Sequence, residues 1–391
     1  MNQNQSFFQS QKAIELALEI AQKLNSSNQL ALIESYRKAG FENDLVTFAL
    51  NQARYQQRGK AKFGEQALQM LFTEPGLEQA TRSAVASWHA SRFKDCGISS
   101  VTDLGAGIGS DALAFLNAEL EVAAIESHPD SFAALEHNLE PHAKATAIQA
   151  DAITHKIATQ AIWLDPARRD QDRKSLTVQR LEPEMFSPNL NYVFDKAREF
   201  PAGIKLAPGF PHELIPNDFE ANWVSHDQDL VELTLWSAPL GRPGIQKAVM
   251  ISDQVLEFEG SDVAAWIGPL GKFIYEPDVS LIRSHLIGDF ANQNQLALIS
   301  ENIAYLTSDQ LVESPWLKTY EVMEVLPLDV KQIKAYCTSH DIGVLEIKKR
   351  GVDITPEQLR PKLKLKGAGA ATLILTKVGS ARQAIVSRPI R

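Results

Sequence analysis

A glycine-rich turn between an apolar strand and a helix constrains the fold of this chain more than any other feature. Residues 101–111 read Val-Thr-Asp-Leu-Gly-Ala-Gly-Ile-Gly-Ser-Asp, with a predicted strand over 101–104 and a predicted helix over 110–118. Glycine lets the backbone adopt positive φ angles and approach a ligand closely. In α/β folds, ligands bind beyond the carboxyl ends of parallel strands. The turn therefore predicts a ligand-binding loop at such an edge.

Short apolar runs alternate with helical patterns around this turn. Such alternation predicts a parallel sheet built from right-handed crossovers, as in Rossmann-like α/β domains. The predicted strands are 101–104, 122–125, 146–149, 161–164 and 204–206, followed by an antiparallel pair, 223–225 and 230–236. A further helix is predicted over 130–139. Residues 11–95 instead show helical spacing throughout. Their later helices are expected near 28–38, 43–57, 64–71 and 77–92, with a break at Pro75-Gly76 before the last.

Acidic residues stand at the ends of four successive predicted strands. Asp103 precedes the glycine turn, and Glu126 ends the next strand 23 residues later. An acid about 20 residues beyond such a turn is typical of ribose binding. Asp151 and Asp165 end the third and fourth runs. Because parallel strands end at the same sheet edge, these four carboxylates predict one polar site.

Residues 103–109 resemble motif I of the class I S-adenosylmethionine-dependent methyltransferases, and the likeness extends over roughly 96–240. The resemblance implies S-adenosylmethionine as cofactor. It places the loop glycines under the methionine part, Asp103 near its amino group, Glu126 at the ribose and Asp151 at the adenine amine. The implied cofactor-binding residues are Asp103, Gly105, Ala106, Gly107, Gly109, Glu126, Ser127, Asp151 and Ala152. A nicotinamide dehydrogenase is the alternative, but the spacing is Gly-x-Gly-x-Gly and an acid ends the strand.

Asp165-Pro166-Ala167-Arg168 resembles motif IV of methyltransferases that modify exocyclic amines. By that resemblance Asp165, Pro166 and Arg168 are the candidate catalytic residues, with Asp165 positioning the acceptor. Ala167 and Arg168 depart from the Pro-aromatic ending of the motif, which puts exocyclic amines in doubt. A guanidinium can also stack on a base or pair with phosphate, although Arg168 and Arg169 could equally pair with Asp170 and Asp172 at the surface.

Two further features bear on the acceptor. Lys205 follows the next strand and is a candidate substrate-binding residue, or else an ordinary surface lysine. Carbon-5 methylation of a pyrimidine would need a cysteine nucleophile. The two cysteines, Cys96 and Cys337, do not lie on the late strands where one is expected, and both are interpreted as buried thiols.

The last 48 residues are basic. They hold eleven Lys and Arg against three Asp and Glu, a net charge of +8, while the whole chain carries −9 and the remainder therefore −17. Strands are predicted over 344–347 and 371–376, with a helix over 356–363. The segment is similar to the THUMP-like domain that ends a group of bacterial class I methyltransferases. That resemblance implies RNA as a partner, with Lys348, Lys349 and Arg350 as candidate contacts, although these lysines could simply solvate a small domain.

The length of 391 residues suits several domains. We expect an N-terminal helical domain (1–95), a methyltransferase domain (96–242), a connecting α+β region (243–320) and a THUMP-like basic domain (321–391).

Two cysteines, no leader pattern and no long apolar run predict a cytoplasmic protein without membrane contact. The nine histidines show no metal-ligand spacing, so no metal is predicted. The oligomeric state stays open.

Together these features predict a methyltransferase acting on a purine nitrogen or amine in tRNA or rRNA. The alternatives are a methyltransferase of a small molecule or protein, and a cofactor-binding protein without catalysis.

Overall fold

The computed structural model describes residues 7–24, 29–168 and 183–390, which fall into two compact units. Unit 1 comprises Met1–Glu220 and Leu233–Gly244, and unit 2 comprises Ala221–Glu232 and Ile245–Arg391. The four domain boundaries expected from the sequence stay predictions. Among the described residues, no helix has both the length and the apolar character needed to cross a membrane.

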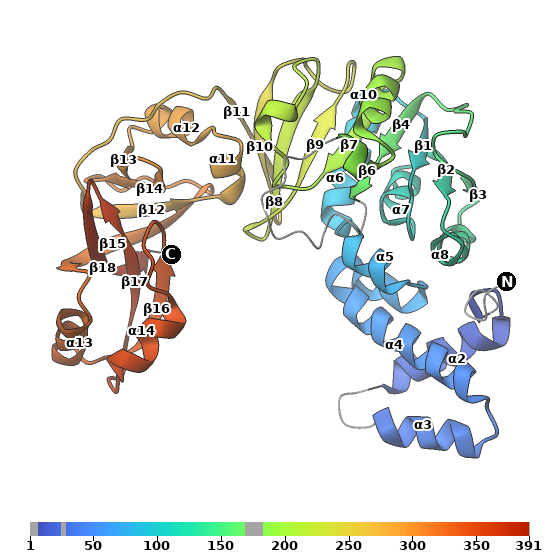
Figure 1. Ribbon diagram of the computed structural model, residues 1–391, viewed down its shortest axis with the longest axis horizontal. Coiled ribbons are helices and arrows are strands. Elements are labelled where there is room, and N and C mark those ends of the chain that lie inside the picture. The colour runs from blue at the N-terminus through green and yellow to red at the C-terminus, as the bar shows by residue number, and fades with distance from the viewer. Residues whose placement is uncertain (1–6, 25–28, 169–182, 391) are drawn as a thin grey trace. The chain divides into compact units, whose positions relative to one another are not determined.

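Unit 1 begins with helices, as predicted. Figure 1 shows α2, α3 and α4 as a group that connects through α5 to the strands of the same unit. The Ser10 hydroxyl caps α2 by accepting from the Ala13 N–H, and Gln57 of α4 donates to the Ala21 carbonyl of α2. Gly64 ends α4 at a φ of 60°. The helical elements are α2 (Gln11–Lys23), α3 (Gln29–Lys38), α4 (Asn43–Phe63), the 3₁₀ turn η1 (Gly64–Gln69), α5 (Glu74–Gln79) and α6 (Ser83–Asp95).

The predicted helix over 77–92 is confirmed over 77–79 and 83–92 but is interrupted at 80–82, and the predicted break at Pro75-Gly76 is wrong. Pro75 lies in the first turn of α5, where its missing N–H leaves no hydrogen bond unmade. The Thr73 hydroxyl caps that turn by accepting from the Gly76 N–H at 3.1 Å. The chain breaks instead at residues 80–82. There the Lys62 ammonium binds the last carbonyls of α5.

The second half of unit 1 is a mostly parallel sheet covered by helices. The strand order is β9-β7-β4-β1-β2-β3, in which only β9 runs antiparallel to its neighbour. The order changes direction between β1 and β4, which is where such folds bind ligands. The elements are β1 (Ser100–Leu104), α7 (Ser110–Asn117), β2 (Glu121–Glu126), α8 (Pro129–Leu139), β3 (Ala145–Gln149), β4 (Ala161–Leu164), β5 (Ala167–Arg168), η2 (Pro183–Met185), β6 (Phe186–Ser187), α10 (Leu190–Glu199), β7 (Ala202–Leu206), η3 (His212–Leu214) and β9 (Asp229–Trp236).

An aromatic cluster fills the core under β4. Trp163 is fully buried and lies 5.7 Å from the Trp236 ring, measured between centroids. Phe93 of α6 and Phe115 of α7 pack edge-on against Trp163. His89 of α6 is also fully buried, with its ring 4.3 Å from that of Trp163. Helix α6 is therefore part of the core of the sheet and packs against β4, the strand that Asp165 follows.

Side-chain amides tie the helical part of unit 1 to the glycine loop. Residues 70–72 are buried and extended, so their backbone groups need partners. Gln52 and Gln56 of α4 bind the backbone of Phe72 and Met70. Asn138 of α8 accepts from the Leu71 N–H and donates to the carbonyls of Leu71 and Ile108.

We expect Asn138→Ala to lower the free energy of unfolding by about 3–5 kcal/mol, because three buried backbone groups lose their partner. Urea denaturation followed by circular dichroism measures this. Asn117→Ala, at an exposed position of α7, is the matched control. Equal stability of the two variants would contradict the structural role of Asn138.

Unit 2 contains the remaining strands. The predicted antiparallel pair is a hairpin of β8 and β9 with Asp227 and Gln228 at positive φ in its turn. Strand β10 pairs with β8 in parallel and with β11 in antiparallel orientation. A second sheet has the order β13-β14-β12-β15-β18-β17-β16. The elements are β8 (Glu220–His226), β10 (Gln246–Ile251), β11 (Val255–Gly260), β12 (Phe273–Pro277), α11 (Val279–Arg283), α12 (Ile287–Gln293), β13 (Ala297–Ser300), β14 (Ile303–Ser308), β15 (Leu317–Pro327), α13 (Val330–Ser339), β16 (Ile342–Lys349), α14 (Pro356–Leu363), β17 (Gly369–Val378) and β18 (Ala381–Ile390).

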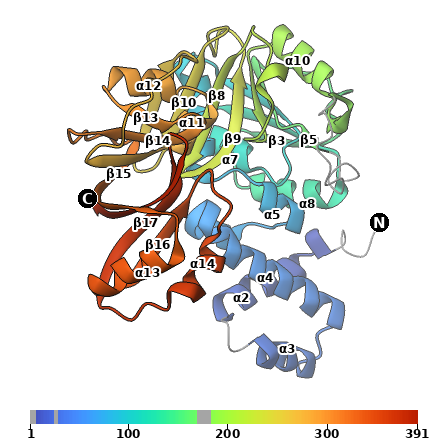
Figure 2. The same cartoon turned by 60° about the vertical axis from the view of Figure 1, so that its left-hand side comes forward.

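The seven-stranded sheet curls so that its distant strands touch. The Arg350 guanidinium donates to the Ala304 carbonyl at 2.5 Å, and the Ser300 hydroxyl donates to the Gly379 carbonyl at 2.7 Å. Helices α13 and α14 pack on β16 and lie together in Figure 2. A capping box of Thr355 and Gln358 starts α14. The strands predicted over 344–347 and 371–376 and the helix over 356–363 are confirmed.

Candidate active site

The glycine loop after β1 has the predicted conformation. Gly105, Gly107 and Gly109 have φ angles of 96°, 59° and 92°, which favour glycine. The N–H groups of Gly105 and Ala106 both donate to the Ile125 carbonyl of β2. A Cβ atom at Gly109 would lie 2.9 Å from the Leu135 side chain, because α8 packs closely there. The loop is thus held against β2 with its glycine backbone open.

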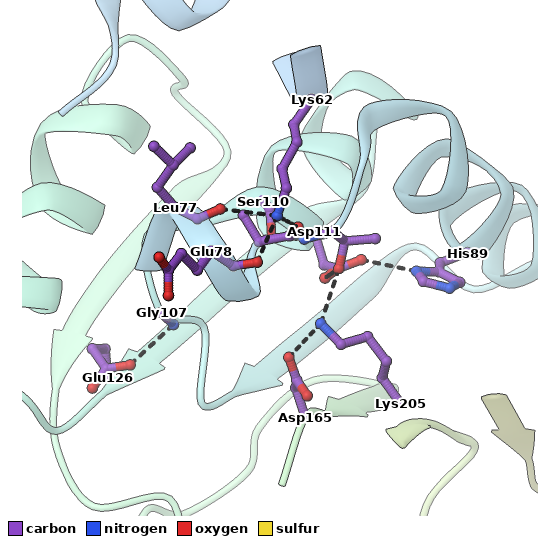
Figure 3. Close-up of polar contacts among 12 residues, drawn as sticks. Lys62, Leu77, Glu78, His89, Gly107, Ser110, Asp111, Glu126, Asp165 and Lys205 are labelled. Atoms are coloured by element: carbon purple, nitrogen blue, oxygen red, sulfur yellow. Dashed lines mark hydrogen bonds and ion pairs between the residues drawn. The ribbon is translucent and has the colours of Figure 1, made fainter. Parts of the chain in front are cut away.

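Glu126 is fixed by backbone donors at the end of β2. Its Oε2 accepts from the Gly107 N–H at 2.9 Å (Figure 3). Its Oε1 accepts from the His128 N–H at 2.6 Å. A carboxylate has about four lone-pair directions, so two bonds leave room for ligand hydroxyls. Ser127 follows and is exposed.

Asp151 and Ala152 lie in a turn after β3. The Asp151 Oδ1 accepts from the Ile153 N–H at 2.7 Å, so this carboxylate organises the turn itself. The Tyr192 hydroxyl of α10 donates to the Ala152 carbonyl at 3.0 Å. The turn is therefore built by local contacts, and the adenine role of Asp151 stays a prediction.

Asp165 and Lys205 form an ion pair at the ends of two adjacent parallel strands. Leu164 of β4 lies opposite Ile204 of β7, so the next residue on each strand projects at the same edge. The Lys205 Nζ lies 2.5 Å from the Asp165 Oδ2, and the two side chains are 13% and 33% exposed (Figure 3). Pro166 is buried, and Arg168 lies in β5, whose backbone pairs with Phe186. The predicted surface partners Arg169, Asp170 and Asp172 lie outside the described residues.

Asp111 joins this site although no sequence motif pointed to it. It is 4% exposed in the first turn of α7. Its Oδ1 lies 2.8 Å from the His89 Nδ1 (Figure 3). Its Oδ2 accepts from the Thr81 hydroxyl at 2.7 Å. Burial alone would raise the pKa of Asp111, but its contacts with His89, Lys205 and Thr81 hold that pKa below its usual value.

Asp103 is the most enclosed carboxyl group of the site. It is 2% exposed at the penultimate position of β1. Burial first, and then the neighbouring charges of Asp111 and Asp165, raise the pKa of Asp103 well above its usual value. Asp103 and Asp165 at strand ends and Asp111 in the first turn of α7 give the site three carboxyl groups, which suit a cationic ligand.

Comparison with known proteins decides the family. Two proteins from Mycobacterium tuberculosis, of strains CDC 1551 / Oshkosh and ATCC 25618 / H37Rv, are each described as an uncharacterized S-adenosylmethionine-dependent methyltransferase. Each is 30% identical to this chain over 338 residues, which cover 83% of this chain and 90% of the relative. The chain belongs to the S-adenosylmethionine-dependent methyltransferases. The methyltransferase class predicted from the sequence is confirmed, and the dehydrogenase alternative is wrong.

Two further comparisons agree with this family assignment. A crystal structure of a candidate methyltransferase from Porphyromonas gingivalis W83 matches with a TM-score of 0.74 at 17% identity, covering 94% of this chain and 100% of that one. The model of the THUMP domain-like family matches residues 317–389. The expected architecture is thereby confirmed: a Rossmann-like core, N-terminal helices and a small C-terminal THUMP-like α+β domain.

The residues of unit 1 fit S-adenosylmethionine, the cofactor of this methyltransferase family. The open glycine backbone and the Glu126 carboxylate suit its methionine and ribose parts. Asp103, Asp111 and Asp165 complement its sulfonium and ammonium charges. When bound, the cofactor supplies an activated methyl group, so the protein contributes mainly binding and alignment.

We expect cofactor binding to release a proton from Asp103. A cation beside this carboxyl group favours its ionised form and lowers the raised pKa, so the affinity should rise with pH. Calorimetry at one neutral pH in two buffers of different ionisation enthalpy measures the release. Asp103→Asn should remove the buffer dependence. Identical binding enthalpies for the unmodified protein in both buffers would contradict the expectation.

The three residues predicted to contact RNA, Lys348, Lys349 and Arg350, lie in unit 2 and differ in their surroundings. Lys348 pairs with Glu276 at 2.6 Å and is 16% exposed. Burial opposes the shift, but the bonds to Glu276 raise the pKa of Lys348 above its usual value. Arg350 lies with its guanidinium 4.9 Å from the Tyr305 ring centroid. Only Lys349 is exposed. Two of the three thus hold the sheet of unit 2 together.

The cysteines need one correction. Cys337 is buried as expected, but Cys96 is exposed, because it follows the end of α6. Neither thiol belongs to the site described above.

Proposed function

We propose that this methyltransferase modifies a nitrogen atom of a purine in RNA, at an amino group or a ring nitrogen. The observation that carries the proposal is the Asp165–Lys205 pair beside the glycine loop. Lys205 pairs with the Oδ2 of Asp165 and holds this partly exposed carboxylate beside the loop, where it can accept a hydrogen bond from an acceptor N–H. An N–H held in this way directs the nitrogen lone pair toward the methyl group.

The likeness of residues 317–389 to THUMP domains supports RNA as the acceptor. The same region carries several exposed lysines. Lys362, Lys364 and Lys366 lie at and after the end of α14, and Lys349 ends β16. Because phosphate contacts dominate RNA affinity, this cluster is the surface on which we place the backbone. Lys348 and Arg350 are left out of it, since both bind other parts of unit 2.

Methyl transfer from radiolabelled S-adenosylmethionine to total RNA from a strain lacking the protein tests the proposal. A labelled purine nucleoside after digestion is the expected result. A labelled pyrimidine would contradict the purine assignment. Label in protein or small molecules, with none in RNA, would overturn the RNA acceptor in favour of the other substrate classes.

The lysine cluster is tested by RNA affinity at several salt concentrations. Lys362→Glu with Lys366→Glu should weaken binding and flatten its salt dependence. Lys331→Glu with Lys334→Glu, at exposed positions of α13, makes the same charge change elsewhere on unit 2. Equal effects of the two pairs would rule out a specific lysine surface.

A further inference from the structure

Two residues from the N-terminal helical region reach the active site. Thr81 lies between α5 and α6, and His89 lies on α6. The Thr81 hydroxyl is 3.0 Å from the Lys205 Nζ and 2.7 Å from the Asp111 Oδ2. With the ion pair of Lys205 and Asp165, a continuous chain of contacts runs from buried His89 to the candidate catalytic carboxylate (Figure 3).

The chemistry of these groups sets the direction of each hydrogen bond. The carboxylate of Asp111, whose pKa is lowered, only accepts, so the single Thr81 hydroxyl proton and the His89 Nδ1 proton both point to it. The lone pairs of the Thr81 oxygen are then left for Lys205, which donates. A hydroxyl in this orientation favours an ammonium over a neutral amine at Lys205.

We propose that Thr81, Asp111 and His89 are positioning residues that hold Lys205 as a cation against Asp165. The proposal rests on the proposed function only in that Asp165 faces the acceptor. Lys205 then fixes the orientation of a carboxylate that is one-third exposed. The carboxylate keeps a constant direction for the acceptor N–H.

The position of Thr81 is itself fixed from two sides. The Lys62 ammonium donates to the carbonyls of Leu77, Glu78 and Ala80 at 2.7–2.9 Å, which uses all three of its protons. The Thr81 N–H donates to the Ser110 hydroxyl at 3.3 Å. The backbone of residues 77–81 is therefore held in place by these contacts, and it keeps the Thr81 hydroxyl beside Lys205.

Several charges face Lys205 and compete over its protonation. Asp111 and Asp165 favour the ammonium, whereas Lys62 opposes it. Asp103 has a raised pKa and adds negative charge only where it is ionised. Thr81 adds a neutral acceptor. Its contribution can be separated from the charges, because valine has nearly the same shape and no hydroxyl.

Competitive acetylation of the full-length protein tests the proposal without any acceptor. Acetic anhydride reacts with the neutral amine only, and the Lys205 peptide is quantified by mass spectrometry. In Thr81→Val, Lys205 should react about tenfold faster than in the unmodified protein at the same pH, the change expected when an ammonium loses one hydrogen-bond acceptor and the neutral amine becomes more populated. Thr81→Ser should restore the original rate. Exposed Lys334 serves as the internal standard.

Each outcome has a distinct meaning. Equal Lys205 reactivity in Thr81→Val and the unmodified protein, with cofactor affinity retained, overturns the positioning role. If Thr81→Val fails to bind cofactor, Thr81→Ala provides the same loss of hydroxyl and the same comparison.

A lack of RNA methylation by the unmodified protein would contradict the proposed function, yet the acetylation rates would still decide the role of Thr81. Where RNA is methylated, Thr81→Val should lower kcat with little change in the KM for cofactor, and Thr81→Ser should restore kcat.

Discussion

Replacing Asp165 by alanine should reduce methyl transfer to RNA by at least roughly 100-fold, the cost of misplacing a reacting group by about 1 Å. In the proposed function the change removes the carboxylate that receives the acceptor N–H, and it releases Lys205 from its partner at 2.5 Å. The affinity for S-adenosylmethionine should stay unchanged if the glycine loop and Glu126 bind most of the cofactor, as we propose. Initial rates with total RNA and calorimetry with the cofactor measure the two quantities separately.

Asp195→Ala is the matched control for Asp165→Ala. Asp195 is an exposed aspartate of α10 that binds Arg198 at the surface of unit 1. Its removal should leave both rate and affinity unchanged. Full activity of Asp165→Ala would show that Asp165 does not position the acceptor. A parallel loss of cofactor affinity would instead assign the residue to cofactor binding.

Replacing Glu126 by alanine should weaken cofactor binding by roughly 100-fold or more. Two charge-assisted hydrogen bonds to ribose hydroxyls contribute about 1.5–3 kcal/mol each, and every 1.4 kcal/mol changes Kd about tenfold. The Gly107 N–H also loses its acceptor, which loosens the loop that lies under the cofactor. Calorimetric titration with S-adenosylmethionine measures the Kd.

Glu121→Ala controls for the loss of a carboxylate from the same strand. Glu121 begins β2, is exposed, and lies at the opposite end from the site. Its variant should bind like the unmodified protein. A Glu126 variant with unchanged Kd would mean that the ribose is held elsewhere, and the roles of the residues after β2 would need to be reassigned.

The strands of unit 1 could be predicted because their signals are local. Each is a short apolar run bounded by a turn or helix, and the structure places β1, β2, β3 and β4 within about one residue of expectation. The loop residues Gly105, Gly107 and Glu126 were found for the same reason. Their spacing along the chain is itself the motif.

Local signals were misread around residue 75. Proline was interpreted as a helix breaker, but the preceding Thr73 is an N-cap, and proline is favoured in a first turn. The real break at residues 80–82 depends on Lys62, which lies some 20 residues earlier. Sequence periodicity carries no information on such a contact.

Thr81, His89 and Asp111 were missed because tertiary packing alone brings them to the site. Thr81 bonds directly to Lys205, a residue that was predicted, although the two are 124 positions apart. Lys348 is the reverse case, a residue that was predicted but has another role. It belongs to a basic run of the sequence and was expected to contact RNA. Its partner Glu276, 72 positions away, makes it part of the interior of unit 2 instead.

The amide bonds around residues 70–72 have a consequence for any shortened version of this enzyme. Asn138 holds Leu71 and Ile108 at once, so α8 and the glycine loop depend on backbone supplied by the N-terminal region. A chain beginning at residue 96 would expose Trp163 where His89 now covers it, and would leave Lys205 without the Thr81 hydroxyl. The part of unit 1 that follows residue 95 should therefore not work as an enzyme on its own. Residues 1–95 supply contacts on which the site in that part depends.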